Sequence, residues 1–123
     1  MPNQKFDLLI VDDSVVLRMM LWEALASEGY SIDQAASGLQ ALEQIKLNSY
    51  RLILLDVKMP IMDGLETLQE IRQIDCQLPI VLMTACESQV FLESGDTWQK
   101  VSQINKPFDL DDLRNIVRNS LVD

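Results

Sequence analysis

The stretch "LILLDVKMP", residues 52–60, places one carboxylate, Asp56, after four consecutive apolar residues. A continuous apolar run of this length is typical of a strand in a parallel sheet that is covered on both faces. We therefore predict a buried strand that ends at Asp56. An acid in that position is the first candidate for a functional group.

Apolar runs of strand length alternate with segments of helical periodicity along the rest of the chain. The predicted strands span residues 6–11, 31–36, 51–56, 79–84 and 101–105. Strands that alternate with helices form βαβ units, in which the strands are parallel and the crossovers right-handed. The sequence thus predicts an α/β fold, a doubly wound five-stranded parallel sheet with helices on both faces.

Helix starts are indicated by short polar side chains that can accept hydrogen bonds from free backbone N–H groups. Such residues stand at Asp13 or Ser14, at Ser37 and at Asp109. Another helix is expected over residues 64–74. Residues 87–98 are expected to form only a short or irregular helix, because Gly95 and Asp96 interrupt the pattern.

Size and hydropathy predict a single domain. The 123 residues are 48% hydrophobic, which suits one globular core, so we expect residues 1–123 to form one domain. No segment resembles a signal peptide, and no apolar run approaches the length that crosses a membrane. These features predict a cytoplasmic protein without membrane insertion.

Charge and residue types exclude several kinds of activity. The 19 acidic residues outnumber the 10 basic ones, and the absence of a long basic run argues against direct binding of DNA or RNA. Because the chain contains no histidine, it cannot use Ser-His-Asp or Cys-His catalysis or a histidine metal site. Its chemistry must depend on carboxylates, Lys, Thr and a metal ion.

Polar residues follow the ends of four predicted strands. Asp12 and Asp13 end the first strand, Asp56 the third and Thr84 the fourth, and Lys106 follows the fifth. In a doubly wound sheet, ligands bind outside the carboxyl ends of the strands, where the strand order reverses. We expect these five side chains to meet in one crevice.

Three carboxylates in one crevice repel one another unless a cation binds or a proton is shared. Oxygen ligands without histidine or a thiolate pair favour Mg²⁺, with Mn²⁺ as a substitute. An ionised Asp56 beside such an ion, near the Thr84 hydroxyl and the Lys106 ammonium, can attack phosphorus, because phosphoryl transfer depends mainly on positioning and charge neutralisation. We predict that Asp56 forms an aspartyl phosphate.

Five motifs cover nearly the whole chain: "LLIVDDS" (8–14), "AASGLQALE" (35–43), "LILLDVKMPIMDGLETL" (52–68), "PIVLMTA" (79–85) and "KPFDLDDLRNIV" (106–117). Together they resemble the response-regulator receiver domain of the CheY type, a flavodoxin-like fold with strand order 2-1-3-4-5. Within that family the chain is similar to single-domain phosphorelay intermediates of the sporulation type, which share a lysine two residues beyond the acceptor, here Lys58.

This resemblance implies a role for each residue of the crevice. It implies a Mg²⁺ site made of Asp12, Asp13, Asp56 and the backbone carbonyl of Lys58. It further implies that Asp56 is the phospho-acceptor, that Thr84 and Lys106 contact the phosphoryl group, and that the bond between Lys106 and Pro107 is cis. Gly64 would allow the backbone turn after the third strand. The expected function is two-component signalling, with a phosphoryl group accepted from a histidine kinase or histidine phosphotransferase and then relayed or hydrolysed. The protein would be a self-phosphorylating acceptor rather than a turnover enzyme.

Two departures from the family pattern concern signal output. The usual Gly-Ala pair before the fifth strand is replaced by Gln99 and Lys100, and the position that often carries a switching Tyr or Phe is Gln103. The second departure favours a relay over a switch that drives an output domain. Both leave open a degenerate receiver that binds partners without being phosphorylated.

The first helix is predicted to carry two apolar faces, given 3.6 residues per turn. The face expected to cover the sheet consists of Leu17, Met20, Leu21, Ala24 and Leu25. The opposite face consists of Val15, Met19, Trp22 and Ala26. With Pro107 and Phe108, this second face could dock the helix bundle of a kinase or phosphotransferase, or another copy of the chain. The alternative is a helix that is simply covered by its neighbours.

Other readings follow from the same residues. The chain could be the receiver fragment of a larger regulator, and its end soon after the last helix suits either case. Its own Met1 and the relay-like features favour a stand-alone protein, which we expect to be a monomer or a phosphorylation-dependent dimer. A haloacid dehalogenase phosphatase would need a second acid where Lys58 stands. A flavodoxin-like nucleotide or flavin binder would need glycine in the turn "VDDSVV", residues 11–16.

Overall fold

The computed structural model describes residues 3–85 and 95–121. In this part of the chain, five parallel strands form one sheet in the order β2-β1-β3-β4-β5. The strands are β1 (Lys5–Val11), β2 (Ile32–Ala35), β3 (Ser49–Asp56), β4 (Ile80–Thr84) and β5 (Val101–Asn105). The helices are α1 (Val15–Ala26), α2 (Gly38–Leu47), α3 (Gly64–Ile74) and α4 (Leu110–Leu121). The predicted α/β fold and strand order are confirmed.

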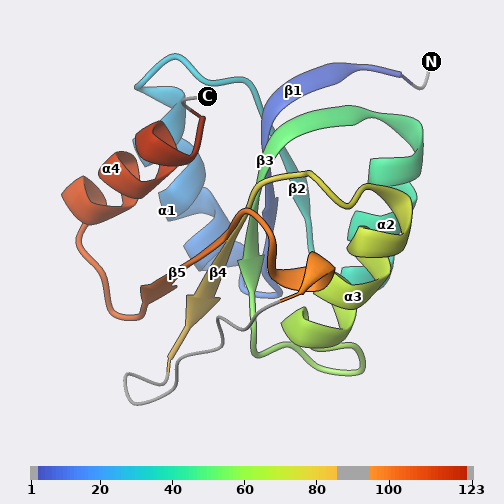
Figure 1. Ribbon diagram of the computed structural model, residues 1–123. Helices are drawn as coiled ribbons and strands as arrows, with labels where there is room; N and C mark the ends of the chain where they lie inside the picture. Colours follow the sequence, from blue (N-terminus) through green and yellow to red (C-terminus); the bar gives the residue numbers. More distant parts are fainter. Residues whose placement is uncertain (1–2, 86–94, 122–123) are drawn as a thin grey trace.

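The sheet is covered on both faces, by α1 and α4 on one side and by α2 and α3 on the other (Figure 1). Successive residues of β1 serve opposite faces: Leu8 and Ile10 pack toward α1 and α4, whereas Leu9 and Val11 pack toward α2 and α3. Because each strand residue is buried on one side or the other, the strands have continuous apolar sequences rather than alternating ones.

The predicted helix caps are observed. The Ser14 hydroxyl accepts a hydrogen bond from the Leu17 N–H at 3.2 Å, so the cap of α1 is Ser14 rather than Asp13. Ser37 and Asp109 accept bonds from backbone N–H groups of α2 and α4 in the same way. These contacts satisfy N–H groups that have no partner within the first helical turn.

The prediction that Met20 faces the sheet is wrong. Leu21, Ala24 and Leu25 form the buried stripe of α1, whereas Met20 is 51% exposed. Adjacent residues of a helix are rotated by about 100°, so Met20 lies beside the narrow stripe that Leu21 occupies. The exposed apolar surface of α1 is therefore wider than the sequence suggested.

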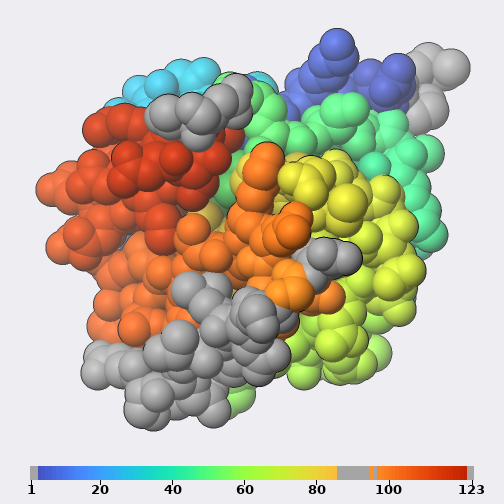
Figure 2. Space-filling model, viewed as in Figure 1, coloured from blue at the N-terminus to red at the C-terminus, as the bar shows by residue number. Residues whose placement is uncertain are grey.

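Most of the helix expected over residues 87–98 lies outside the described residues. Its last three residues form a single 3-10 turn, η1 (Asp96–Trp98). Figure 2 shows the connection from this turn to β5 packed between α3 and α4. The connection is fixed to α3 by the buried Arg72, whose guanidinium donates hydrogen bonds to the carbonyls of Thr97 at 2.9 Å and Gln99 at 2.6 Å.

Candidate functional site

Two buried acids lie side by side at the carboxyl ends of the central strands. The register pairs Val11 of β1 with Leu55 of β3, so Asp12 and Asp56 follow on adjacent strands. Asp12 is 1% exposed and Asp56 is 4% exposed. Their position results directly from the sheet topology, because β1 and β3 run parallel and end at the same edge.

Asp13 joins these two acids. Asp12, Asp13 and Asp56 each offer a carboxylate oxygen, and the three oxygens lie within 4.8 Å of one another. Asp13 is exposed and the other two are buried, so the cluster opens to solvent on one side. The structure therefore brings together all three acids that the sequence analysis selected as metal ligands.

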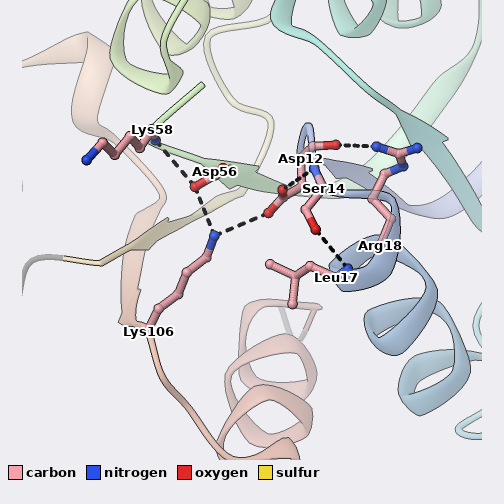
Figure 3. A network of polar contacts seen from close by, with 7 residues as sticks. All are labelled: Asp12, Ser14, Leu17, Arg18, Asp56, Lys58 and Lys106. Atoms are coloured by element: carbon pink, nitrogen blue, oxygen red, sulfur yellow. Dashed lines mark hydrogen bonds and ion pairs between the residues drawn. The ribbon is translucent and has the colours of Figure 1, made fainter. Parts of the chain in front are cut away.

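Lys106 lies between the two buried acids (Figure 3). Its Nζ is 3.1 Å from Oδ1 of Asp56 and 3.3 Å from Oδ2 of Asp12. Its backbone N–H donates to the Thr84 carbonyl at 2.6 Å, and the bond to Pro107 is cis. The lysine thus enters the crevice from the loop after β5, as its place in the sequence predicted.

The crevice is unfavourable for an ionised Asp56 in the absence of a further cation. Burial and the negative charge of Asp12 raise the pKa of Asp56, while Lys106 and the Lys58 N–H lower it to a smaller extent. The Lys106 ammonium pairs with two of the three carboxylates in the cluster. Their arrangement leaves a negative charge that a divalent cation with oxygen ligands can neutralise.

Lys58 contacts Asp56 through its backbone. Its N–H donates to Oδ1 of Asp56 at 3.3 Å, while its ammonium group points away from the acid (Figure 3). Oδ1 of Asp56 therefore accepts hydrogen bonds from the Lys58 N–H and from the Lys106 ammonium. No residue in the described ranges donates a hydrogen bond to Oδ2. The role of the Lys58 carbonyl as a metal ligand remains a prediction.

Thr84 is buried at the end of β4, 3% exposed. It follows Met83, which pairs with Asp56 in the sheet and whose carbonyl accepts the Val57 N–H at 2.9 Å. The Thr84 hydroxyl is therefore carried by the residue that follows Met83, the sheet partner of Asp56. Its contact with a phosphoryl group remains a prediction.

Gly64 lies behind Asp56, where the chain turns from β3 into α3. It does not have the positive φ that a turn glycine adopts. Instead, a Cβ atom at this position would lie 2.3 Å from the carbonyl oxygen of Asp56, and the Gly64 N–H donates to the Val57 carbonyl at 2.7 Å. Glycine is required because α3 begins directly against the end of β3.

Two residues beside the crevice were missed by the sequence analysis. Arg18 donates through Nη1 to the main-chain carbonyl of Asp12, at 2.5 Å (Figure 3). Asp63 begins α3 with a capping box that it forms with Glu66. The box has the recognisable spacing of an acid and a glutamate three residues apart. For Arg18 the available signal was a charged residue inside an otherwise apolar segment.

The predicted docking residues of α1 are exposed. Val15 is 59% exposed, Met19 62% and Trp22 43%. Val16 and Met20 extend this surface, and part of it borders a hollow of about 400 Å³. In the loop after β5, Pro107 is exposed, whereas Phe108 is partly buried against the core beneath α1 and α4.

Gln103, which stands where the family often has a switching Tyr or Phe, makes a polar side-chain contact. Gln103 pairs with Leu82 in the sheet, and its side-chain amide donates to Oδ1 of Asn105 at 3.0 Å. Gln99 accepts a side-chain hydrogen bond from Gln77 at 3.0 Å. Both residues therefore make polar side-chain contacts with neighbouring residues.

The fold and crevice define a receiver domain, and comparison with known proteins agrees. Residues 8–118 match the family model of the response regulator receiver domain. The chain therefore belongs to this family, which acts in two-component signalling.

Particular relatives cover the chain almost completely. It is 38% identical over 121 residues to sporulation initiation phosphotransferase F of Bacillus subtilis (strain 168), a match that covers 98% of this chain and 96% of that protein. It is 34% identical to the transcriptional regulatory protein ZraR of Escherichia coli (strain K12), covering 98% of this chain but 27% of ZraR. The structure of the Thermotoga maritima response regulator TrrA in complex with Mg²⁺-BeF has a TM-score of 0.80 at 33% identity, covering 97% of this chain and 99% of TrrA.

Among the described residues, no helix has the length and apolar character needed to cross a membrane.

Proposed function

We propose that Asp56 accepts a phosphoryl group from the phosphohistidine of a histidine kinase or histidine phosphotransferase, and that the chain passes this group on in a relay. The observation that carries the proposal is the position of Lys106, whose Nζ lies 3.1 Å from Asp56 in a cluster with two further acids. This arrangement supplies a nucleophile and opposite charges within one crevice.

A Mg²⁺ ion suits the donor set of the crevice. Three carboxylates lie within 4.8 Å of one another, and carboxylate oxygens are the ligands this ion prefers. We propose that Asp12, Asp13, Asp56 and the Lys58 carbonyl hold it, with Mn²⁺ as a substitute. When bound, the ion would neutralise negative charge on the carboxylates and on the oxygens of the phosphoryl group. The Mg²⁺-BeF complex of TrrA, a protein of similar fold, supports this choice.

The reaction itself is carried by Asp56. Its Oδ2, which receives no hydrogen bond from the described residues, attacks the phosphorus of the phosphohistidine. The new O–P bond forms as the P–N bond breaks, and the imidazole nitrogen leaves with the electron pair and takes a proton from solvent. The Lys106 ammonium balances charge on the transferring oxygens, and the Thr84 hydroxyl donates a hydrogen bond to one of them.

The relay role is supported by the likeness to sporulation initiation phosphotransferase F over 96% of that protein's length. Gln103 in place of an aromatic switch agrees with it. We further propose that residues 1–123 act as a single cytoplasmic domain. The match to 27% of ZraR favours the alternative, a receiver that is joined to an output domain. The mass of the natural full-length protein distinguishes the two.

The exposed face of α1 is proposed as the docking surface for the phosphodonor. The face begins at Val15, directly after Ser14, whose N–H donates to the Asp12 carboxylate at 2.9 Å, so it lies beside the crevice that a protein donor has to reach. The neighbouring edge strand is closed to strand addition at Gln34, whose N–H binds the Asp33 carboxylate and whose carbonyl accepts from Gln44. A helical partner therefore fits this surface.

Intact mass spectrometry after incubation with phosphoramidate tests the proposal, because this small donor carries a P–N bond. With Mg²⁺ the wild type should gain one phosphoryl group, whereas Asp56→Asn and an EDTA sample should gain none. Asp111→Asn, an exposed acid of α4, is the matched control and should behave as the wild type. Equal labelling of Asp56→Asn, or an unlabelled wild type, would contradict the proposal, and the latter would favour a degenerate receiver.

A further inference from the structure

Arg18 joins the acidic crevice to the edge strand of the sheet. Its Nη1 donates to the main-chain carbonyl of Asp12 at 2.5 Å, and its Nε donates to the side-chain oxygen of Gln34 on β2 at 3.2 Å. Figure 3 shows the guanidinium and Lys106 on opposite sides of Asp12. Both partners of Arg18 are uncharged oxygens, so the contact is directional and does not reflect pairing with an acid.

The carbonyl that Arg18 binds belongs to the peptide group between Asp12 and Asp13. Holding this peptide sets the direction in which both side chains leave the backbone. On its other side, Asp12 is fixed by its N–H, which donates to the Ala35 carbonyl at 3.2 Å. The Asp12 carboxylate accepts a hydrogen bond from the Ser14 N–H at Oδ1 and one from the Lys106 ammonium at Oδ2.

The guanidinium suits this task because its donors lie in one rigid plane. One donor binds Asp12, and the Gln34 contact fixes the rotation of the plane. Gln34 is itself held by Gln44, whose amide donates to the Gln34 carbonyl at 3.1 Å. A lysine would present a single nitrogen in place of the separate Nη1 and Nε donors, so it would not reproduce this pair of contacts in one fixed plane.

We propose that Arg18 is a positioning residue for the divalent-cation site. It holds the Asp12–Asp13 peptide in the orientation that brings both carboxylates to Asp56, and Gln34 orients its guanidinium. This inference rests on the proposed function, which places a cation in the crevice. It adds a residue that touches neither the cation nor the phosphoryl group.

Mn²⁺ binding to the metal-free protein, followed by electron paramagnetic resonance, tests the proposal without any phosphoryl transfer. Arg18→Met removes both donors but keeps most of the apolar stem, and should weaken Mn²⁺ binding by about tenfold or more, as is typical for residues that orient metal ligands. Gln34→Met should weaken it less, and Arg18→Lys should not restore wild-type affinity. Arg118→Met removes an arginine that pairs with Glu28 at the surface, and should leave the affinity unchanged.

A second readout is the NMR signal of the Ser14 amide, which donates to the Asp12 carboxylate. It should shift in Arg18→Met and stay in place in Arg118→Met. A role in stability alone would lower the melting temperature but leave this signal and the affinity of the folded protein unchanged. A folded Arg18→Met with wild-type affinity would overturn the proposal. If Arg18→Met does not fold, wild-type affinity in both Arg18→Lys and Gln34→Met would overturn it.

Mn²⁺ binding, combined with the phosphoramidate labelling described above, separates this inference from the proposed function. A wild type that binds Mn²⁺ but takes no phosphoryl group contradicts the proposed function alone. A wild type that binds no Mn²⁺ contradicts both.

Discussion

The ammonium group of Lys106, the first residue after the last strand of the sheet, lies 3.1 Å from Oδ1 of Asp56. The two residues are 50 positions apart in the chain and meet because β3 and β5 are parallel and end at the same edge. The same ammonium contacts Asp12, so one cation faces two buried carboxylates. Several consequences of this contact can be measured.

Replacing Lys106 with Met should lower the free energy of unfolding in EDTA by about 1–3 kcal/mol, because buried charged groups lose their partner. Mg²⁺ should reduce this loss, since the ion then neutralises the same carboxylates. Urea unfolding with and without Mg²⁺ measures both effects. Lys58→Met is the control, because its ammonium points away from Asp56, and it should change stability by less than about 0.5 kcal/mol. Equal stability of the two variants in EDTA would contradict the account.

The stability of the metal-free protein should depend on pH through Asp56. Burial and the Asp12 charge raise its pKa above the ordinary value. A group whose pKa is higher in the folded than in the unfolded state stabilises the fold when protonated, and this contribution is lost as the pH rises through the folded pKa. The free energy of unfolding in EDTA should therefore gain an Asp56 contribution as the pH falls from neutral.

Asp56→Asn cannot ionise and should lack this part of the pH dependence, while Asp111→Asn should keep it. Urea unfolding over a pH series in EDTA compares the three proteins. An Asp56→Asn profile that runs parallel to the wild type would show that the crevice does not disfavour the ionised acid.

Adding a methyl group to Gly64 should be strongly destabilising. The new Cβ would lie 2.3 Å from the Asp56 carbonyl oxygen and 2.6 Å from the Val57 Cα, both parts of the main chain. We expect Gly64→Ala to cost at least about 2 kcal/mol, in the upper part of the range for overpacking. Gly38→Ala is a matched comparison, because its Cβ would meet side-chain atoms of Thr67 and Met62 that can move. Chemical denaturation should rank Gly64→Ala as the more damaging change.

A charge on the exposed face of α1 should affect partner recognition alone. Met19→Glu should slow transfer from a purified phosphorylated histidine phosphotransferase by about tenfold, the loss expected when one interface contact of about 1.4 kcal/mol is removed. Its labelling by phosphoramidate should match the wild type, because the crevice is unchanged. Leu47→Glu, an exposed leucine at the end of α2, is the control and should leave both rates unaltered. Normal protein-to-protein transfer by Met19→Glu would place the docking surface elsewhere.

The fold could be predicted from the sequence because hydrophobic periodicity and strand length reflect burial on two faces. The observed β5 coincides with the predicted strand, and β3 begins two residues earlier than expected because Ser49 and Tyr50 pair with β1. The crevice followed from a general property of parallel sheets, whose strands end at one edge. The positions of Asp12, Asp13, Asp56 and Lys106 were thereby predicted together.

Contacts to main-chain carbonyls were not predictable in the same way. Arg18 and Arg72 bind carbonyl oxygens, which every residue carries, so no pattern of side chains marks them. Gly64 was noticed, but its close approach to Asp56 depends on how α3 is seated against β3. The exposure of Met20 depends likewise on the width of the surface that α1 covers.

The position of the phosphoryl group on the chain decides whether Asp56 is the acceptor. Borohydride reduces an aspartyl phosphate to homoserine, so reduction of the phosphoramidate-treated protein, followed by peptide mass spectrometry, identifies the acceptor. We expect homoserine at position 56 alone, and only in samples that contain Mg²⁺. Homoserine at position 12 or 13 would place the acceptor elsewhere, and homoserine at 56 in the presence of EDTA would exclude a role for the divalent cation.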